Sequence, residues 1–509
     1  MTVPRSLADA LRDELRTIAN PDRDWVVPVN RALAEAYRGG SSDDVAEIAL
    51  LGALWLDARG RFREAMANIE FGLATLDHGA AQRSHLLGAQ AGLLALAGRL
   101  EEARRATDRA RDAVPAAPRA RLELAAYDSV VECVALAPTA ANLGGQAIVG
   151  GDRAGYDWLA SGVGIWLVPW HAARGDTATA AVLVRSLGAR AQANGHATRE
   201  ADAKALEAAL DAASGEDQSS FPGDDVRALA RWRRLLAVGR SSLIRGSWLD
   251  ARVALELHEE LVERMNPGFR FLSGGFLALL DVYEGVRSPS IPSPEGVPVT
   301  LITLPAMLAA AEAAALGGSA EACLAWLEGL RGIPEGVTTS LEWPVAVDRI
   351  RALLLVRLGR VAPARASFAR AVRSMEAAGN PIEVELTRLH RAEAEAIAAH
   401  RPDRSLVRER GEAMRRLAAL GVSPFPPAYA VTRALSDDRV SAASELLTAR
   451  EIEVVRALAD GLSYRGAGER LGISWRTVQS HATRAYRKLG ASRRSEAVAV
   501  ARARRLIER

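Results

Sequence analysis

The side chains with the clearest chemistry lie near the carboxyl end of this 509-residue chain. From Arg470 to Arg494 there are seven basic residues and no acidic one, whereas an ordinary solvated helix would interleave glutamates. Residues 441–509 carry 14 basic and 7 acidic side chains, so the net charge of +3 divides into +7 here and −4 over the preceding 440 residues. Arginine-rich runs of this kind bind the phosphate backbone of nucleic acids. The segment therefore predicts a nucleic-acid contact.

Short helices must position these side chains, and local signals predict three of them, over residues 448–460, 463–471 and 475–489. Thr448 and Glu451 form a capping box at the start of the first helix. Ser463 and Ser474 are suited to cap the second and third helices. Gly472 and Ile473 form the tight turn between these two helices. Two helices joined by a glycine-containing turn are a helix-turn-helix.

These residues resemble the LuxR-type domain, also called the FixJ or NarL type, over about 60 residues, an eighth of the chain. The positions that match are Leu447-Thr448-x-Arg450-Glu451-x-Glu453-Val454, Gly461-Leu462-Ser463, Glu469-Arg470-Leu471-Gly472-Ile473-Ser474, Thr477-Val478-x-x-His481, Arg487-Lys488-Leu489-Gly490 and Glu496-Ala497-Val498. The resemblance implies a four-helix DNA-binding domain over residues 445–509, in a transcription regulator that dimerises on a pseudo-palindromic site. It also implies that the third helix enters the major groove of double-stranded DNA and that the fourth helix forms the dimer contact.

Roles for single residues follow partly from this match and partly from side-chain chemistry. The candidates for base contacts share one outward face of the third helix and are Gln479, Ser480 and Thr483. Gln bonds adenine in bidentate fashion, while Ser and Thr bond several bases. The candidates for phosphate contacts flank that face and are Ser463, Arg465, Arg476, Thr477, Arg484, Arg487 and Lys488. His481 matches the histidine that is usual in this family, so we expect packing or a phosphate contact rather than catalysis.

The sequence departs from the family pattern in the second helix, where Gly466-Ala467-Gly468 replaces the usual Glu-Ile-Ala. Each glycine in a helix interior costs about 1 kcal/mol relative to alanine, and truncation of a buried isoleucine to alanine costs about 2–5 kcal/mol. We therefore expect a weak second helix. Ala482 and Ala485 also replace larger apolar residues, and Trp475 and Tyr486 are candidates to refill that volume. A vestigial domain that no longer binds DNA is the alternative.

The rest of the chain predicts an all-α fold. Alanine-rich segments have apolar residues at helical spacing, and a Gly turn followed by a second helix recurs at Gly60, Gly98, Gly175, Gly246, Gly317 and Gly359. The intervals of 38, 77, 71, 71 and 42 residues are close to one or two periods of 36–40 residues. This pattern resembles tetratricopeptide-type hairpins over roughly residues 40–400, and it predicts an α-solenoid in which each turn glycine adopts a left-handed backbone.

Composition breaks divide the chain further. We expect a first half of the helical-repeat region over residues 1–286, an exposed Pro-rich loop over 287–300 and a second half over 301–421. A linker over residues 422–444 then leads to the terminal domain. The whole chain resembles the rear half of larger LuxR-type regulators that carry an amino-terminal ATPase.

Several chemistries are excluded by residue usage. The only lysines, Lys204 and Lys488, do not fit a phosphate-binding P-loop, so an ATPase is not expected. Cys133 and Cys323, far apart in the chain, predict buried thiols and no metal site. No catalytic triad, zinc motif or glycine-rich cofactor loop is present, so we expect neither an enzyme nor a cofactor.

The concave face of a helical solenoid suits a protein, peptide or small-molecule effector. Trp158, Trp166 and Trp170 fall on one side of a predicted helix and are either part of the core or the lining of a ligand pocket. A homodimer and a contact with RNA polymerase are further partners that we expect. The chain has neither a signal-peptide pattern nor an 18-residue apolar stretch, which predicts a cytoplasmic protein without a membrane partner. The alternative function is a scaffold or anti-regulator whose terminal domain is vestigial.

Overall fold

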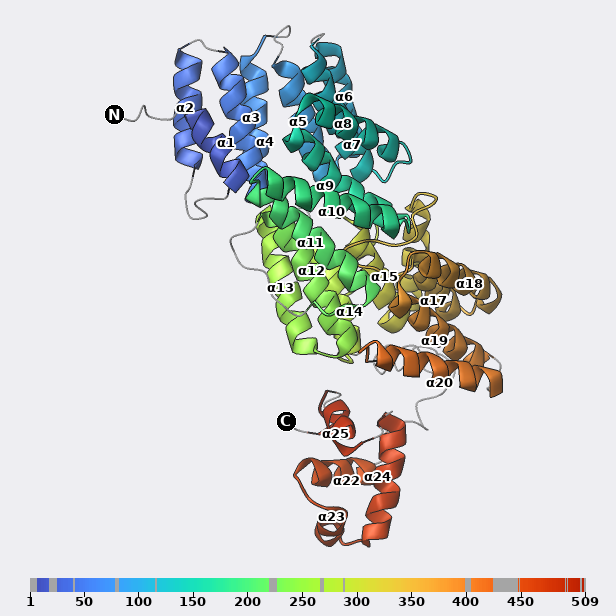
Figure 1. Cartoon of the computed structure of the whole chain (residues 1–509). Helices are drawn as coiled ribbons and strands as arrows, with labels where there is room; N and C mark the ends of the chain where they lie inside the picture. Colours follow the sequence, from blue (N-terminus) through green and yellow to red (C-terminus); the bar gives the residue numbers. More distant parts are fainter. Residues whose placement is uncertain are drawn as a thin grey trace.

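The computed structural model describes residues 7–17, 25–39, 42–77, 82–114, 117–218, 227–265, 270–286, 289–398, 404–423, 447, 449–489, 491, 493–503 and 506–507. These residues form helices and no strand, as the all-α prediction requires. Figure 1 shows a long region of stacked helices, α1 to α20, and a separate group, α22 to α25. No helix in the described part of the chain has the length and apolar character needed to span a membrane.

The helices of the repeat region are α1 (Leu7–Thr17), α2 (Val26–Arg38), α3 (Ser42–Ala58), α4 (Phe62–Thr75), α5 (Arg83–Leu96), α6 (Leu100–Ala113), α7 (Pro118–Val134), α8 (Ala140–Ala154), α9 (Asp157–Ala173), α10 (Thr177–Ala193), α11 (Ala197–Ser214), α12 (Ala228–Arg245), α13 (Trp248–Met265), α14 (Arg270–Tyr283), α15 (Leu304–Gly317), α16 (Ala320–Gly329), α17 (Val347–Arg357), α18 (Val361–Ala377), α19 (Pro381–Ala398) and α20 (Arg404–Ala419). The terminal group is α22 (Ala449–Ala459), α23 (Tyr464–Leu471), α24 (Trp475–Leu489) and α25 (Arg494–Ala503).

Glycines end many of the helices, which then turn into an antiparallel partner. Gly60, with φ of +73°, lies between α3 and α4, and Gly246, with φ of +81°, lies between α12 and α13. Gly98, Gly175 and Gly359 also have positive φ, as we expected. The expectation was wrong for Gly317, which is the last residue of α15 and has no positive φ. A side chain at position 317 would be too close to α14, because an added Cβ would lie 2.7 Å from a methyl carbon of Val282.

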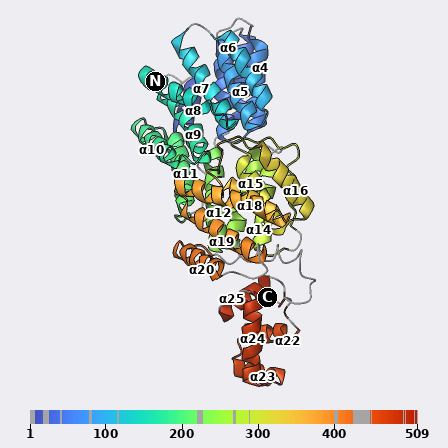
Figure 2. The ribbon, with the colours of Figure 1, turned by 90° about the vertical axis from the view of Figure 1, so that its right-hand side faces the viewer.

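The later helices pack back against the turns of the earlier ones, and Figure 1 shows α15 to α20 beside α9 to α14. Backbone hydrogen bonds join the later segments to the ends of α7, α9 and α12. The N–H of Leu301 donates to the carbonyl of Val134 at 2.8 Å, that of Thr338 to Ala173 at 2.8 Å, and that of Ser423 to Ile244 at 2.9 Å. The turned view in Figure 2 shows the same stacking of α12, α14, α15 and α18. The helical array is therefore folded on itself rather than extended along one line.

The Pro-rich segment contains no helix in its described residues, 289–300, and it is exposed only in part, whereas we expected an exposed loop. Ile291, Val297 and Val299 pack against the main hydrophobic core, and the indole N–H of Trp326 donates to the carbonyl of Pro292 at 3.0 Å. The core continues across the segment, since one cluster of buried side chains includes residues from Leu11 to Ala394. The expectation failed because its apolar residues alternate with prolines and cover α14 to α16. Nearly all of the predicted linker, 424–444, lies outside the described residues.

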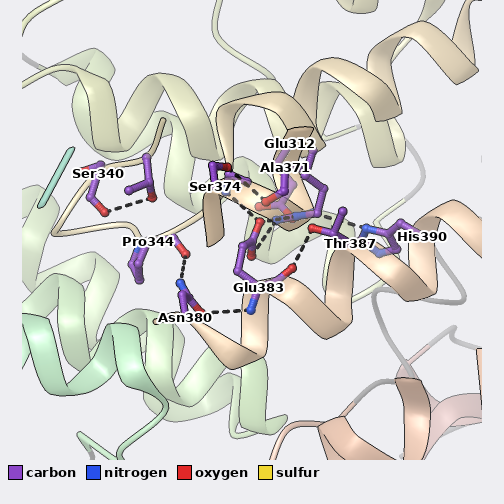
Figure 3. Close-up of polar contacts among 12 residues, drawn as sticks. Glu312, Ser340, Pro344, Ala371, Ser374, Asn380, Glu383, Thr387 and His390 are labelled. Carbon is purple, nitrogen blue, oxygen red and sulfur yellow. Dashed lines mark hydrogen bonds and ion pairs between the residues drawn. The ribbon is translucent and has the colours of Figure 1, made fainter. Parts of the chain in front are cut away.

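A buried cluster of charged side chains lies between α12, α15, α17 and α19. Arg349 of α17 is fully buried and its Nη1 lies 2.8 Å from Oε1 of Glu312 in α15. Its Nε bonds Glu383 of α19, which also accepts from the backbone N–H of Ala346 at 2.8 Å. A second arginine, Arg240 of α12, lies 3.8 Å from the same Glu383. Figure 3 shows how the labelled Glu312 and Glu383 converge from different helices. The cluster thus joins four helices through paired charges.

Candidate nucleic-acid interface

The terminal group of helices has a small core in two parts. Val454, Leu458, Ala467 and Val478 belong to one cluster, which joins α22, α23 and the first half of α24. The second cluster joins α22, the end of α24 and α25 and comprises Leu447, Val455, Ala485, Leu489, Ala497, Ala501 and Ile507. Because α24 contributes one face to both clusters, its opposite face is left toward solvent.

The turn between α23 and α24 is held by caps that the sequence predicted. Ser463 caps α23, its hydroxyl oxygen accepting from the N–H of Gly466 at 3.2 Å. Ser474 does the same for α24 by accepting from the N–H of Thr477 at 3.1 Å. Gly472 is left-handed, with φ of +67°, and ends α23. These caps confirm the predicted helix-turn-helix elements, apart from Thr448, which lies outside the described residues.

All three candidates for base contacts lie on the exposed face of α24. Gln479, Ser480 and Thr483 are exposed, and the hydroxyl of Thr483 donates to the carbonyl of Gln479 at 2.8 Å. That bond leaves the oxygen lone pairs and the methyl group of Thr483 on the surface. Arg476 and Arg484 are exposed on the same helix and have no ion pair among the described residues. The helix therefore presents neutral hydrogen-bonding groups flanked by cations.

The remaining phosphate candidates have different surroundings. Thr477 is half-buried and its hydroxyl lies 2.7 Å from that of Ser474, while Arg465 of α23 is exposed and lies 3.8 Å from Glu469. Ser463 is exposed, although its oxygen serves as the α23 cap. The side chains of Arg487 and Lys488 lie outside the described residues. Thus the side chains of five of the seven candidates are described: Ser463 and Arg465 belong to α23 or its cap, and the other three belong to α24.

Comparison with known proteins assigns this part of the chain. Residues 445–501 match the family model described as bacterial regulatory proteins, luxR family. The transcriptional regulatory protein YdfI of Bacillus subtilis is 47% identical over 55 residues, which cover 11% of this chain and 26% of YdfI. The putative HTH-type transcriptional regulators Mb0914c of Mycobacterium bovis and MT0914 of Mycobacterium tuberculosis are each 36% identical over 94 residues, 16% of this chain and 11% of the relative.

The terminal domain is a LuxR-family helix-turn-helix domain. This chain spans 26% of the length of YdfI and 11% of the length of each mycobacterial relative, and these matches cover 11% and 16% of this chain.

Two features of the LuxR-family domain were missed or misread at the level of sequence. Gly468 looked like a loss of helix stability, yet an added Cβ would lie 2.7 Å from the carbonyl oxygen of Ile473. The backbone N–H of Ile473 also donates to the carbonyl of Gly468 at 3.0 Å, so this glycine allows the turn to approach α23. By contrast, Gly466 has no atom nearer than 3.7 Å to such a Cβ. α23 forms despite both glycines, and its expected weakness stays a prediction.

We expected Trp475 to refill the core of the LuxR-family domain, and this expectation was wrong. It is the first residue of α24, its side chain is 49% exposed, and the guanidinium carbon of Arg476 lies 5.4 Å from the ring centroid. Trp475, Gln479 and Thr483 are spaced four positions apart, so the three follow one stripe of the helix. That spacing is the signal in the sequence that could have placed Trp475 on the exposed face, whereas we expected it in the core.

The tryptophans considered as a ligand pocket lie in α9, far along the chain from the LuxR-family domain. Trp166 and Trp170 are buried and Trp158 is half-buried. The guanidinium group of an arginine packs on each ring. The distance from the guanidinium carbon to the ring centroid is 3.9 Å for Arg199 and Trp158, 5.5 Å for Arg233 and Trp166, and 4.7 Å for Arg174 and Trp170. This packing favours the core interpretation of the three rings.

Proposed function

We propose that this protein is a DNA-binding transcription regulator in which α24 enters the major groove of double-stranded DNA. The observation that carries the proposal is the exposed face of α24 in a domain of the LuxR family, where Gln479, Ser480 and Thr483 lie between two cations. These cations, Arg476 and Arg484, have no ion pair among the described residues. The relatives that share the domain bear the names of transcriptional regulators, which supports the same function here.

The contacts follow from side-chain chemistry. Gln479 bonds the N6 and N7 edge of adenine, and Ser480 and Thr483 bond neighbouring bases, with the Thr483 methyl against a thymine methyl. The phosphate contacts come from Ser463, Arg465, Arg476, Thr477, Arg484, Arg487 and Lys488, which fix the register of the helix but read no sequence. A homodimer places two copies of α24 about 34 Å apart, one turn of DNA, on a pseudo-palindromic site.

The helical-repeat region senses an effector or binds a protein partner and so controls the terminal domain, without catalysis and in the cytoplasm. An open surface depression of about 550 Å³ among α4, α5 and α6 is a candidate place for such a partner. Its lining is mostly charged and includes Glu70, Glu102, Arg105 and Asp108, so it suits a polar or charged partner. A contact with RNA polymerase is a further part of the proposal.

The test is DNA binding by the full chain. Genomic sites bound by the protein are mapped, and the affinity for the recovered site is measured in a titration from 50 to 200 mM salt. We expect the logarithm of the binding constant to fall linearly with the logarithm of salt concentration, with a slope of about −0.9 for each phosphate contacted. Gln479→Ala should lose about 1–3 kcal/mol at one base position only, whereas Arg476→Ala should weaken every site alike.

Arg365→Ala provides the control, because Arg365 is an exposed arginine of α18 in the repeat region and should leave DNA binding unchanged. If the full chain binds no genomic fragment at 50 mM salt, the proposal is wrong and the alternative of a protein-binding scaffold with a vestigial terminal domain gains support. If Gln479→Ala and Arg476→Ala act alike on all sequences, the assignment of base and phosphate contacts is wrong.

A further inference from the structure

The last helix of the repeat region, α20, has one packed face and one open face. Ala413 and Leu417 pack in a small cluster with side chains of α19, including Leu386 and Leu389. On the opposite side Arg404, Arg408 and Arg415 are exposed. Their spacings of four and seven residues put them in one stripe along the helix. The terminal helix of a solenoid needs a polar outer face for solubility, but solubility does not require a single sign of charge.

The arginines of this stripe differ from their neighbours on α20 in their partners. Arg410 lies 3.0 Å from Glu393 and Arg416 lies 3.2 Å from Glu385, both on α19. In the stripe, by contrast, the single ion-pair partner of Arg408 among the described residues is Glu412, at 3.7 Å. Arg404 and Arg415 have no ion pair among the described residues. The two acidic residues of α20, Glu409 and Glu412, are half-buried, so every exposed charge of the helix is an arginine.

The repeat region as a whole does not share this charge, although α18 also exposes Arg365, Arg370 and Arg373. Residues 1–440 carry a net charge of −4, and α13 exposes Asp250, Glu256, Glu260 and Glu263 beside one exposed arginine, Arg264. A polyanion is therefore repelled by the repeat region as a whole and attracted at α20. Electrostatic complementarity of this kind sets the orientation in which a charged partner approaches.

The chain also keeps α20 close to the DNA that the terminal domain binds. Ser423 is the last described residue after α20, and Leu447 is the next described residue. The 24 peptide steps between them span at most about 80 Å when fully extended. One turn of the double helix is about 34 Å, so phosphates on either side of a bound half-site are within reach.

We infer that the outer face of α20, with Arg404, Arg408 and Arg415, is a second DNA contact that binds phosphates flanking the site read by α24. The inference rests on the proposed function, since it needs a bound terminal domain to bring DNA near. This contact carries no sequence information. It raises the affinity for DNA, makes binding more dependent on salt and lengthens the footprint on the duplex. It also orients the repeat region with its acidic faces away from the duplex.

The experiment uses the full chain and a triple variant, Arg404→Gln, Arg408→Gln and Arg415→Gln. The matched control is Arg365→Gln and Arg373→Gln on α18 together with Arg360→Gln at its N-cap. It removes the same charge from exposed positions and likewise includes one long ion pair, Arg365 with Glu395 at 3.6 Å. We expect the salt slope of the α20 variant to fall by about 2–3, at about 0.9 for each lost phosphate contact, with the control close to the wild type. Melting curves check that both variants remain folded.

Duplex length provides a second readout. The wild type should bind a mapped site more tightly in a 40-base-pair duplex than in one trimmed to the site, and the α20 variant should bind the two alike. An unchanged slope in the α20 variant, or an equal loss in the α18 control, overturns the inference but leaves the proposed function standing. If the wild type itself binds no DNA, the proposed function fails, and this inference fails with it.

Discussion

Arginine has opposite roles in the two regions of this molecule. In the repeat region Arg233 and Arg349 are almost completely buried, and each is paired with a carboxylate. In the terminal domain Arg476 and Arg484 are exposed and have no ion pair among the described residues. A buried arginine must be paired, because the desolvation of an unpaired charge costs several kcal/mol. An exposed one contributes little to folding and remains available to an external polyanion.

The difference explains how a chain with 65 basic residues and a net charge of only +3 can still have a strongly basic domain. The repeat region neutralises its arginines internally and across helices, as Arg252 does with Asp281 and Glu284. The terminal domain has too few carboxylates to do so. Overall charge therefore says less about partners than the location of the uncompensated side chains.

The largest effect should come from breaking the inward pairing. Arg349→Met removes the guanidinium and leaves Glu312 and Glu383 buried without it, which should lower the free energy of unfolding of the repeat region by about 3–5 kcal/mol. Arg484→Met, the matched change at an exposed arginine, should stay within about 0.5 kcal/mol. Chemical denaturation measures both. Equal stability of the two variants would contradict the contrast between the regions.

A second test concerns acid. Burial lowers the pKa of His258, between Trp232 and Phe276, to about 3. Since the folded pKa is below the value of about 6.5 in the unfolded chain, the stability due to the neutral ring is complete above pH 6.5 and is lost as the pH falls toward 3. Between pH 6.5 and 4.5 the loss should be about 2–3 kcal/mol. His258→Leu should flatten the stability profile of the repeat region in this window, and an unchanged profile would refute the assignment.

The two glycines of α23 sharpen the picture of the terminal domain. Gly468→Ala should destabilise it by about 1–3 kcal/mol, because the new Cβ meets the carbonyl of Ile473. Gly466→Ala meets no close atom and should stabilise the helix by up to about 1 kcal/mol. Hydrogen exchange of the α23 and α24 amides in the full chain separates the two. Stabilisation by both alanines would mean that the turn does not need its glycine.

The smallest expected effect is on DNA affinity. Trp475→Ala removes an exposed apolar ring from the stripe of Gln479 and Thr483, and it should cost about 1 kcal/mol at sites with a thymine at one position. Replacement of that thymine by uracil, which lacks the methyl group, should reduce the difference between the wild type and the variant. Binding titrations with the two duplexes measure this. If the variant loses the same affinity on both, Trp475 contacts the backbone instead.

Local signals predicted the terminal domain well. Ser463, Ser474 and Gly472 act within four residues of their own positions, so spacing alone identified the caps and the turn. In the repeat region the sequence predicted the left-handed glycines correctly. The predictions failed where segments distant in the sequence are in contact. Gly317 packs against Val282, and the Pro-rich segment covers helices on both sides of it in sequence. The role of Gly468 was hidden for a related reason, because its neighbour is the backbone of the following turn.

The sequence by itself determined the helices, many of their turns, the LuxR-type motif and the net charge of each region, since these depend on neighbours a few positions apart. Only the tertiary structure decided which arginines are buried in ion pairs. Arg233 pairs with Glu342, which is 109 residues away in the sequence, and Arg349 pairs with Glu383, which is 34 residues away. The physical reason is that a charge loses its water only when helices distant in sequence close around it, and it then needs a partner that those same helices supply.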